Sequence, residues 1–288
     1  MLVYLLLIAA VSISSSAKDG NYDFSNRALV LSLKLMQIVS VILIFILPTF
    51  LFTLFLTEEK LLYLCLHKKV QIQSVFFVLL IIVSMSPLIN WMTELNGKMV
   101  LPTSMSNIEH WMKASEEQYT KLTEAFLKMN TVKDLLFNLF VIAFLAALGE
   151  EILFRGVLQK TLMESVKNIH IAVWLTAIIF SAFHFQFYGF FPRMMLGVLL
   201  GYLFMWSNSL WLPIIAHFTN NGLAVVLEYL NTKKLINFDV DKIGINNNTG
   251  ILLGSIVLVS IFIFAIYKNE VSSSNKKELT SACGNRQL

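Results

Sequence analysis

The stretch "NLFVIAFLAALGEEILFRG", residues 138–156, decides how this chain must fold. Its apolar part carries no charge, and two adjacent acids and an arginine follow it directly. A carboxylate in an apolar setting is costly, so it is paired or neutralised. Residues four apart share one helix face, whereas neighbours diverge by about 100°. Glu151 and Arg155 can therefore pair, which leaves Glu150 without a partner on its own helix. The alternative is that both acids lie at a helix end near the lipid headgroups.

The composition around this stretch is that of a polytopic membrane protein. Hydrophobic residues make up 57% of the 288 residues and charged residues 14%, whereas about a quarter of an ordinary globular protein is charged. Apolar blocks long enough to cross a bilayer as helices recur along the chain. We predict an all-α transmembrane helix bundle of about eight spans, over residues 2–13, 28–56, 74–92, 134–156, 169–187, 192–206, 209–230 and 250–267.

Four marginal or polar segments need separate interpretations. Residues 2–13 predict a short span that stays in the membrane, with a cleaved signal peptide as the alternative. Residues 57–73 group their apolar side chains between charged ends, which predicts an interfacial amphipathic helix. Residues 94–133 predict a surface helix over the mouth of a pocket, or simply a connector. The tail after Lys268 is polar, and we expect it to be disordered.

The net charge of +4 does not indicate a nucleic-acid partner. Most basic residues lie in short polar segments between apolar blocks, where Lys and Arg set the orientation in the membrane. The positive loops around Lys68 and Lys167 and the tail after Lys268 then face the cytoplasm, and eight spans put both termini inside. Lys34 is alone within an apolar block and is expected to extend toward the interface. The two cysteines are isolated and indicate neither a disulfide framework nor a thiolate metal site.

Three separate spans carry polar side chains that are expensive in a membrane and therefore indicate a functional site. Glu150 lies on the first, His184 on the second, and His217 and Asn221 share one face of the third. Each has an ordinary explanation alone, as a helix-end charge, a packing histidine or a polar contact between helices. Together they supply the groups that activate water and stabilise an oxyanion, with or without a metal. The chain contains no HExxH, GxSxG or Walker sequence.

The motifs EExxFR (150–155), FxxxH (180–184) and HxxxN (217–221), in this order on separate helices, resemble those of the CPBP family. That family takes in CAAX prenyl proteases and bacteriocin-processing and immunity proteins, also called Abi proteins. The resemblance implies a CAAX-protease-like catalytic membrane domain over residues 134–230. Residues 1–133 would form an N-terminal transmembrane and connector region, and residues 231–288 the last span and a disordered cytoplasmic tail.

The resemblance also implies a role for each motif residue in an intramembrane endopeptidase. Glu150 would activate water, and the residues that support it or bind a metal or the oxyanion would be Glu151, Arg155, His184, His217 and Asn221. Two imidazoles facing one carboxylate favour a zinc ion held by the two histidines, and a metal-free glutamate mechanism is the alternative. The expected partners are the lipid bilayer and a protein or peptide substrate, in the cell membrane of a bacterium.

Two other functions stay open at this point. A catalytically idle immunity or scaffold protein would share the fold without the reaction. A transporter would also place Glu and His inside helices, but it should show related polar turns in two halves of the chain. Here all these polar turns lie between residues 150 and 221, which disfavours a transporter.

Overall fold

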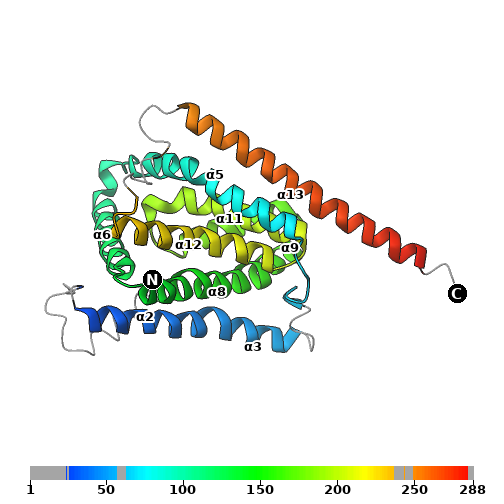
Figure 1. Cartoon of the computed structure of the whole chain (residues 1–288), viewed down its shortest axis with the longest axis horizontal. Helices are drawn as coiled ribbons and strands as arrows, with labels where there is room; N and C mark the ends of the chain where they lie inside the picture. The colour runs from blue at the N-terminus through cyan, green and yellow to red at the C-terminus, as the bar shows by residue number, and fades with distance from the viewer. Residues whose placement is uncertain (1–23, 25, 57–62, 237–242, 244–248, 285–288) are drawn as a thin grey trace.

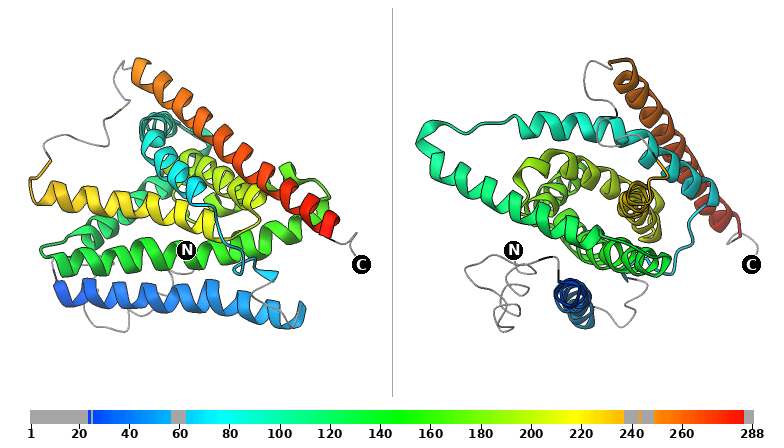
Figure 2. Two further views of the ribbon diagram at one scale, coloured as in Figure 1. Left: turned by 45° about the vertical axis from the view of Figure 1, so that its right-hand side comes forward. Right: turned by 60° about the vertical axis from the view of Figure 1, so that its left-hand side comes forward.

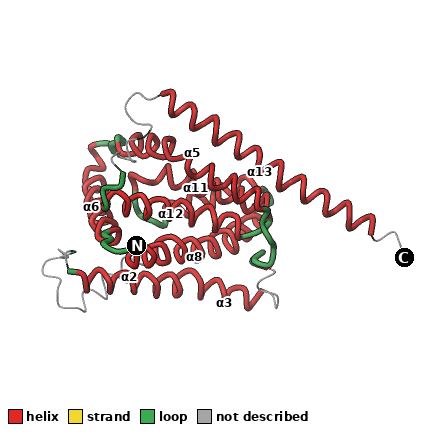
Figure 3. The backbone as a smooth tube through the Cα atoms, in the orientation of Figure 1, coloured by secondary structure: helices red, strands yellow, loops and turns green. Residues whose placement is uncertain are grey.

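A computed structural model of the chain describes residues 24, 26–56, 63–236, 243 and 249–284 (Figure 1). The predicted span at residues 2–13 lies outside these residues. Within the described part, the backbone consists of helices and loops and contains no strand (Figure 3). The predicted all-α fold is therefore confirmed.

Several of the helices follow one another without a break. The first continuous helix is α2 (Arg27–Val41), η1 (Ile42–Ile46) and α3 (Leu47–Leu56). It is followed by α5 (Ile72–Gly97), η2 (Thr103–Met105) and α6 (Ser106–Leu127). The acidic stretch lies in a second continuous helix, made of α7 (Val132–Asn138), η3 (Leu139–Leu145), α8 (Ala146–Leu153), η4 (Phe154–Gln159) and α9 (Lys160–Val166). The others are α10 (Ile169–Ala182), η5 (Phe187–Gly189), α11 (Phe190–Ser207), α12 (Trp211–Thr232) and α13 (Thr249–Gly284).

Five described helices are long and apolar enough to cross a membrane. They are Arg27–Phe55, Ile72–Gly97, Val132–Val166, Phe187–Ser207 and Thr249–Ser272. The predicted span at 169–187 is the shorter apolar helix α10, and the predicted span at 209–230 is α12, which carries the polar motif HxxxN. The chain is thus a multi-pass membrane protein.

Polar side chains fix where the site-bearing helices begin. The Thr131 side chain accepts from the Asp134 amide and the Asp134 carboxylate accepts from the Thr131 amide, which together form a capping box at the start of α7. Asn168 caps α10 by accepting from the amide of Ile171. Asn208 ends α11 in the left-handed conformation, with φ of 49°, which asparagine tolerates better than most residues.

Helix α12 lies inside the bundle, between α5 and α11 on one side and η3–α8 on the other (Figures 1 and 2). Helices α10 and α11 pack against each other, and α13 packs along α5. The helix α2–η1–α3 runs along α8 on the outside of the bundle. The polar motifs of α8 and α12 therefore meet in the interior.

The segment at residues 57–73 is not an interfacial helix in its described part. From Leu64 to Gln71 it forms turns and loop, and Leu64 and Cys65 are buried against α8 and the start of α12. Its backbone carbonyls are bonded by side chains from the α11–α12 junction, as when Trp211 Nε1 donates to Leu66 O over 2.8 Å. These contacts replace the hydrogen bonds that a helix would make internally.

Two further expectations are wrong. The tail was expected to be disordered, but α13 continues as a helix to Gly284 because adding residues to an existing helix is much easier than nucleating one. Lys34 does not extend toward the interface, since α2 begins seven residues earlier and buries it. Its ammonium donates to Asn138 Oδ1 over 2.8 Å, and Asn138 Nδ2 donates to Phe126 O over 2.7 Å.

Candidate active site

The two adjacent acids lie on α8, which is flanked by the π-helical turns η3 and η4. Such turns are uncommon in helices and occur frequently at functional sites. Glu151 is fully buried, whereas the Glu150 side chain keeps 14% of its exposure. Although they are neighbours in sequence, the two carboxylates therefore have different surroundings.

Glu151 is the centre of a buried hydrogen-bond network through its Oε1, whereas its Oε2 and Nε of Arg155 have no hydrogen-bond partner. Its Oε1 accepts from Arg155 Nη1 over 2.7 Å and contacts His217 Nδ1 at 2.8 Å. Arg155 Nη2 donates to Gly197 O over 3.0 Å, and its guanidinium lies 4.7 Å from the centre of the Phe180 ring. The predicted ion pair is thus present, and it joins α8 to α11 and α12.

Glu150 faces two imidazoles across a gap. Its Oε2 lies 3.8 Å from Nε2 of His184 and 3.8 Å from Nε2 of His217, and this buried oxygen has no hydrogen-bond partner. Nδ1 of His184 lies 2.9 Å from Phe180 O, and Nδ1 of His217 faces Glu151. Because both of these partners are acceptors, each Nδ1 carries the proton. In the neutral rings, each Nε2 then presents a lone pair toward Glu150.

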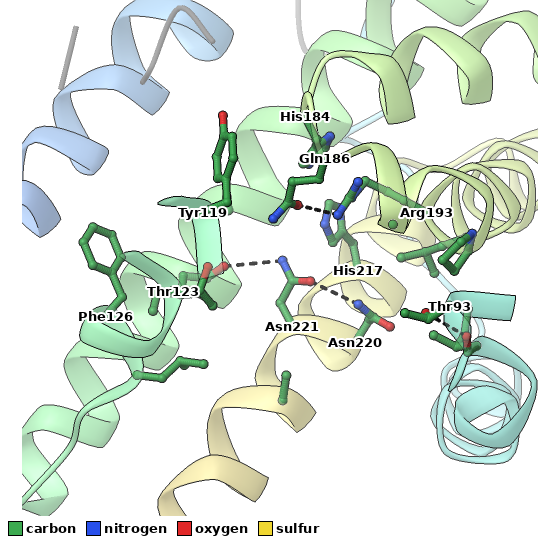
Figure 4. Close-up of a pocket in the computed structure, with 18 of the residues that line it drawn as sticks. Thr93, Tyr119, Thr123, Phe126, His184, Gln186, Arg193, His217, Asn220 and Asn221 are labelled. Atoms are coloured by element: carbon green, nitrogen blue, oxygen red, sulfur yellow. Dashed lines mark hydrogen bonds between the residues drawn. The ribbon is translucent and has the colours of Figure 1, made fainter. Parts of the chain in front are cut away.

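Asn221 lies one turn beyond His217 on α12, as the HxxxN spacing predicts. Its Oδ1 accepts from Asn220 Nδ2 over 3.1 Å, and its Nδ2 lies 3.4 Å from Ile142 O (Figure 4). The amide oxygen is therefore turned toward Asn220. The second N–H of Asn221 has no acceptor among these contacts.

One cavity of about 770 Å³ is lined by Glu150, His184, His217, Asn220 and Asn221. Glu151 and Arg155 are not part of its lining. Helix α6 forms one wall of it, with the residues Glu116, Tyr119, Leu122, Thr123, Phe126 and Leu127. Of the two interpretations of residues 94–133, contact with a pocket fits α6, because its residues line the cavity. The size is typical of a small-ligand pocket.

The donor groups around Glu150 do not have the spacing of zinc ligands. Two ligands of one tetrahedral zinc ion lie about 3.3 Å apart, because each bond to the metal is about 2.0–2.1 Å long. The separations of 3.8 Å around Glu150 are wider. Within the described residues, no group of three or more His, Cys, Asp or Glu side chains is positioned to hold a metal ion. The site as arranged does not form a three-ligand centre.

Sequence reasoning missed several polar side chains of the cavity, among them Arg193 and Gln186. An arginine at the start of a span is normally an interfacial charge, so the sequence gives no reason to place it inside. Arg193 instead donates through Nη2 to Gln186 Oε1, and both residues line the cavity (Figure 4). Glu116 lines it from α6. Burial raises the pKa of Glu116, and the backbone of Tyr188 and the charge of Arg193 offset this only in part.

The chain is a polytopic helix bundle with a buried polar site between its helices, and comparison with known proteins shows what this region resembles. Residues 132–223 match the family described as type II CAAX prenyl endopeptidase, Rce1-like. The uncharacterized protein YpbD of Bacillus subtilis is 34% identical over 85 residues, which cover 28% of this chain and 40% of that protein.

A second relative is the membrane-embedded CAAX protease MroQ of Staphylococcus aureus. It is 30% identical over 103 residues, which cover 34% of this chain and 41% of that protein. The chain thus matches about two fifths of the length of these relatives, and no solved structure matches it. The matched region contains all three motifs, and over this region the chain is similar to membrane-embedded CAAX-type proteases.

Proposed function

We propose that this protein is an intramembrane endopeptidase that hydrolyses a peptide bond of a protein or peptide substrate, with Glu150 as the base that activates water. The observation that carries the proposal is the unpartnered Oε2 of Glu150, which faces two imidazole nitrogens at the wall of a cavity. A buried carboxylate oxygen without a partner is costly, so its placement calls for a polar ligand.

The arrangement suits a water molecule between the three groups. Such a water can donate one hydrogen to Glu150 and the other to the lone pair of His184 or His217 Nε2. Glu150 then takes a proton as the water oxygen attacks the peptide carbonyl carbon, and it returns that proton to the leaving nitrogen as the C–N bond breaks. The free N–H of Asn221 is the donor that we assign to the oxyanion.

The histidines have a narrower role in this scheme than the sequence suggests. A neutral ring with its proton on Nδ1 cannot donate from Nε2. His184 and His217 therefore hold the water rather than the oxyanion. Glu151 fixes the proton on His217 Nδ1, and Arg155 balances the charge of Glu151, so both act as positioning residues.

Two alternatives compete with this proposal. An idle scaffold or immunity protein of the same fold has no need for an unpartnered Glu150, whose replacement by a neutral residue would then change nothing except stability. A transporter would move a solute through the same cavity without breaking a bond. The cavity and its polar groups lie on one side of α12 rather than in two matched halves, which favours the protease.

The test uses the purified full chain in lipid vesicles with a peptide mixture made by digesting a bacterial proteome. We expect new peptide ends, detected by mass spectrometry, to appear with the wild type. With Glu150→Gln they should fall by about 10²–10⁴-fold, while the melting temperature stays the same. Equal cleavage by the variant would overturn the assignment of Glu150. Absence of cleavage by the wild type would favour the idle protein or the transporter.

The zinc expectation is tested on the same preparations. If zinc takes part, purified protein should hold about one equivalent, and His184→Ala and His217→Ala should lose metal and activity together. If the reaction runs without metal, these variants should lose activity while the metal content stays near zero, and a chelator should not affect the wild type. Zinc bound in one equivalent by a variant that lacks both histidines would refute the site.

A further inference from the structure

Arg193 is a second polar feature of the cavity that the proposed reaction does not use. Its Nη2 donates to Gln186 Oε1, whereas its buried Nη1 has no hydrogen-bond partner. Within the described part of the chain, no carboxylate forms an ion pair with it at 4.0 Å or less, although Glu116 and Glu150 line the same cavity. A guanidinium within a membrane bundle is costly unless an anion balances its charge.

The guanidinium is held in place by its surroundings. A Cβ at position 189 would lie only 3.1 Å from Arg193 Nη2, so the missing side chain of Gly189 lets the guanidinium lie against the backbone. The loop before α11 is tied to α5 by Asn96, whose Nδ2 donates to Phe187 O over 3.1 Å and whose Oδ1 accepts from the Phe191 amide over 3.0 Å. The N–H groups of Arg193 are therefore preorganised to bind a ligand.

Arg193 and Gln186 together present hydrogen-bond donors to the cavity. Arg193 offers the two N–H groups of Nη1, and because Gln186 uses its oxygen to accept from Arg193, its amide nitrogen is left to donate. A fork of N–H groups with a positive charge matches the two oxygens of a carboxylate. Gln186 is two residues from His184, so an anion bound here would lie near the proposed reaction centre.

We infer that Arg193 and Gln186 bind a carboxylate of the substrate and so set which peptide bond reaches Glu150. This inference rests on the proposed function. The carboxylate has two possible sources, the C-terminus of a peptide or an acidic side chain near the cleaved bond. In either case, the anion balances the charge of Arg193, and the distance between the two sites selects the bond.

The experiment uses three mixtures of synthetic decapeptides with wild type, Arg193→Gln and Arg193→Lys in lipid vesicles. The first mixture has acidic residues and a free C-terminus, the second has acidic residues and an amidated C-terminus, and the third is amidated and has Asn and Gln in place of the acids. Cleaved and retained peptides are identified by mass spectrometry. Melting temperatures exclude variants that fail to fold.

We expect the wild type to prefer one carboxylate-bearing mixture over its neutral counterpart by about 10–100-fold, as the loss of a charged hydrogen bond implies. Arg193→Gln should abolish that preference, and Arg193→Lys should restore part of it because it keeps the charge without the fork. Preference for the first mixture over the second identifies the C-terminus, and preference for the second over the third identifies a side chain.

The control variant is Glu116→Gln, which removes the acid of α6 from the same cavity. If Arg193 binds the substrate, this variant should keep the preference for a carboxylate. If Arg193 serves only to balance Glu116, then Glu116→Gln and Arg193→Gln should have the same effect, and the inference fails. It also fails if the wild type treats all three mixtures alike, or neither cleaves nor retains any peptide. If the wild type retains carboxylate peptides through Arg193 without cleaving them, the inference stands and the proposed function fails.

Discussion

Helix α8 has one face that opens on the cavity and others that are closed by neighbouring helices. Glu150 lies on the open face, and its Oε2 has no hydrogen-bond partner. Glu151 lies on a closed face, where Arg155 and His217 both contact its Oε1. Two side chains of the same type therefore have different surroundings. Glu151 holds neighbouring helices together, whereas Glu150 has an oxygen free to bind a ligand, and only the packing around each side chain makes this difference.

The largest effect on stability should come from the closed face. We expect Glu151→Gln to lower the free energy of unfolding by about 3–5 kcal/mol, because it leaves the fully buried Arg155 without its counter-charge. The yield of folded protein should fall with it. The measurement is the melting temperature in detergent, together with the amount of protein recovered from the membrane.

The matched control is the same substitution one residue earlier. Glu150→Gln changes an oxygen that has no partner, so we expect the melting temperature to stay near that of the wild type while activity is lost. If the two substitutions destabilise the protein equally, the two faces of α8 do not differ, and the comparison between them is broken.

The sequence already contained much of this difference. The i, i+4 spacing of Glu151 and Arg155 predicted their pair, and the same geometry left Glu150 alone. What it could not give was the partner from outside the helix, because the contact between Glu151 and His217 depends on how α8 and α12 pack. Lys34 shows the same limit, since its partner Asn138 lies on a helix 104 residues away.

A closed face of α8 should also be destabilised by a larger side chain. A Cβ at Gly149 would lie 2.5 Å from Val41 Cγ1 and 3.3 Å from Phe45 Cβ, on the helix α2–η1. Valine has little rotamer freedom in a helix, so the backbones must separate. We expect Gly149→Ala to cost about 1–3 kcal/mol in the free energy of unfolding, measured by thermal or denaturant unfolding in detergent.

Gly254 on α13 provides the control for this substitution, because nothing lies within 4 Å of the Cβ position there. Gly254→Ala should leave stability unchanged or raise it by up to about 1 kcal/mol through helix propensity. A Gly149→Ala protein as stable as the Gly254→Ala protein would mean that α8 and α2 are not packed as tightly as described.

The two histidines extend the comparison to the site itself. The His217 side chain is 5% exposed and contacts Glu151, whereas the His184 side chain is 28% exposed and contacts only the backbone oxygen of Phe180 among the bonds described. We expect both alanine variants to lose activity, but only His217→Ala to lose about 1–3 kcal/mol of stability. Activity and melting temperature measured on one preparation separate the two effects, and equal stability of the two variants would contradict the network around Glu151.

The cavity residues Arg193 and Gln186 were not predicted from the sequence, and both were missed for the same physical reason. Arg193 and Gln186 belong to the loop before α11 and its first turn, where polar residues are ordinary and carry no signal of burial. Their inward direction depends on the loop fold, which Asn96 fixes from α5. Motifs within spans were predictable because polar groups are rare there, whereas polar groups at helix ends need the structure.

The smallest effect concerns the orientation of Asn221, which Asn220 controls. Asn220 Nδ2 donates to Asn221 Oδ1 over 3.1 Å, so removing it with Asn220→Ala frees the Asn221 amide to rotate. A neutral hydrogen bond contributes about 0.5–1.5 kcal/mol, so we expect kcat to fall by about 2–10-fold at unchanged KM. Asn221→Ala removes the donor itself and should lower kcat by about 10²–10³-fold.

Asn220→Asp sharpens the test, because a carboxylate accepts from Asn221 Nδ2 and would turn both of its N–H groups away from the cavity. We expect kcat of Asn220→Asp to lie below that of Asn220→Ala; the opposite order would mean that Asn221 does not act as a donor to the oxyanion.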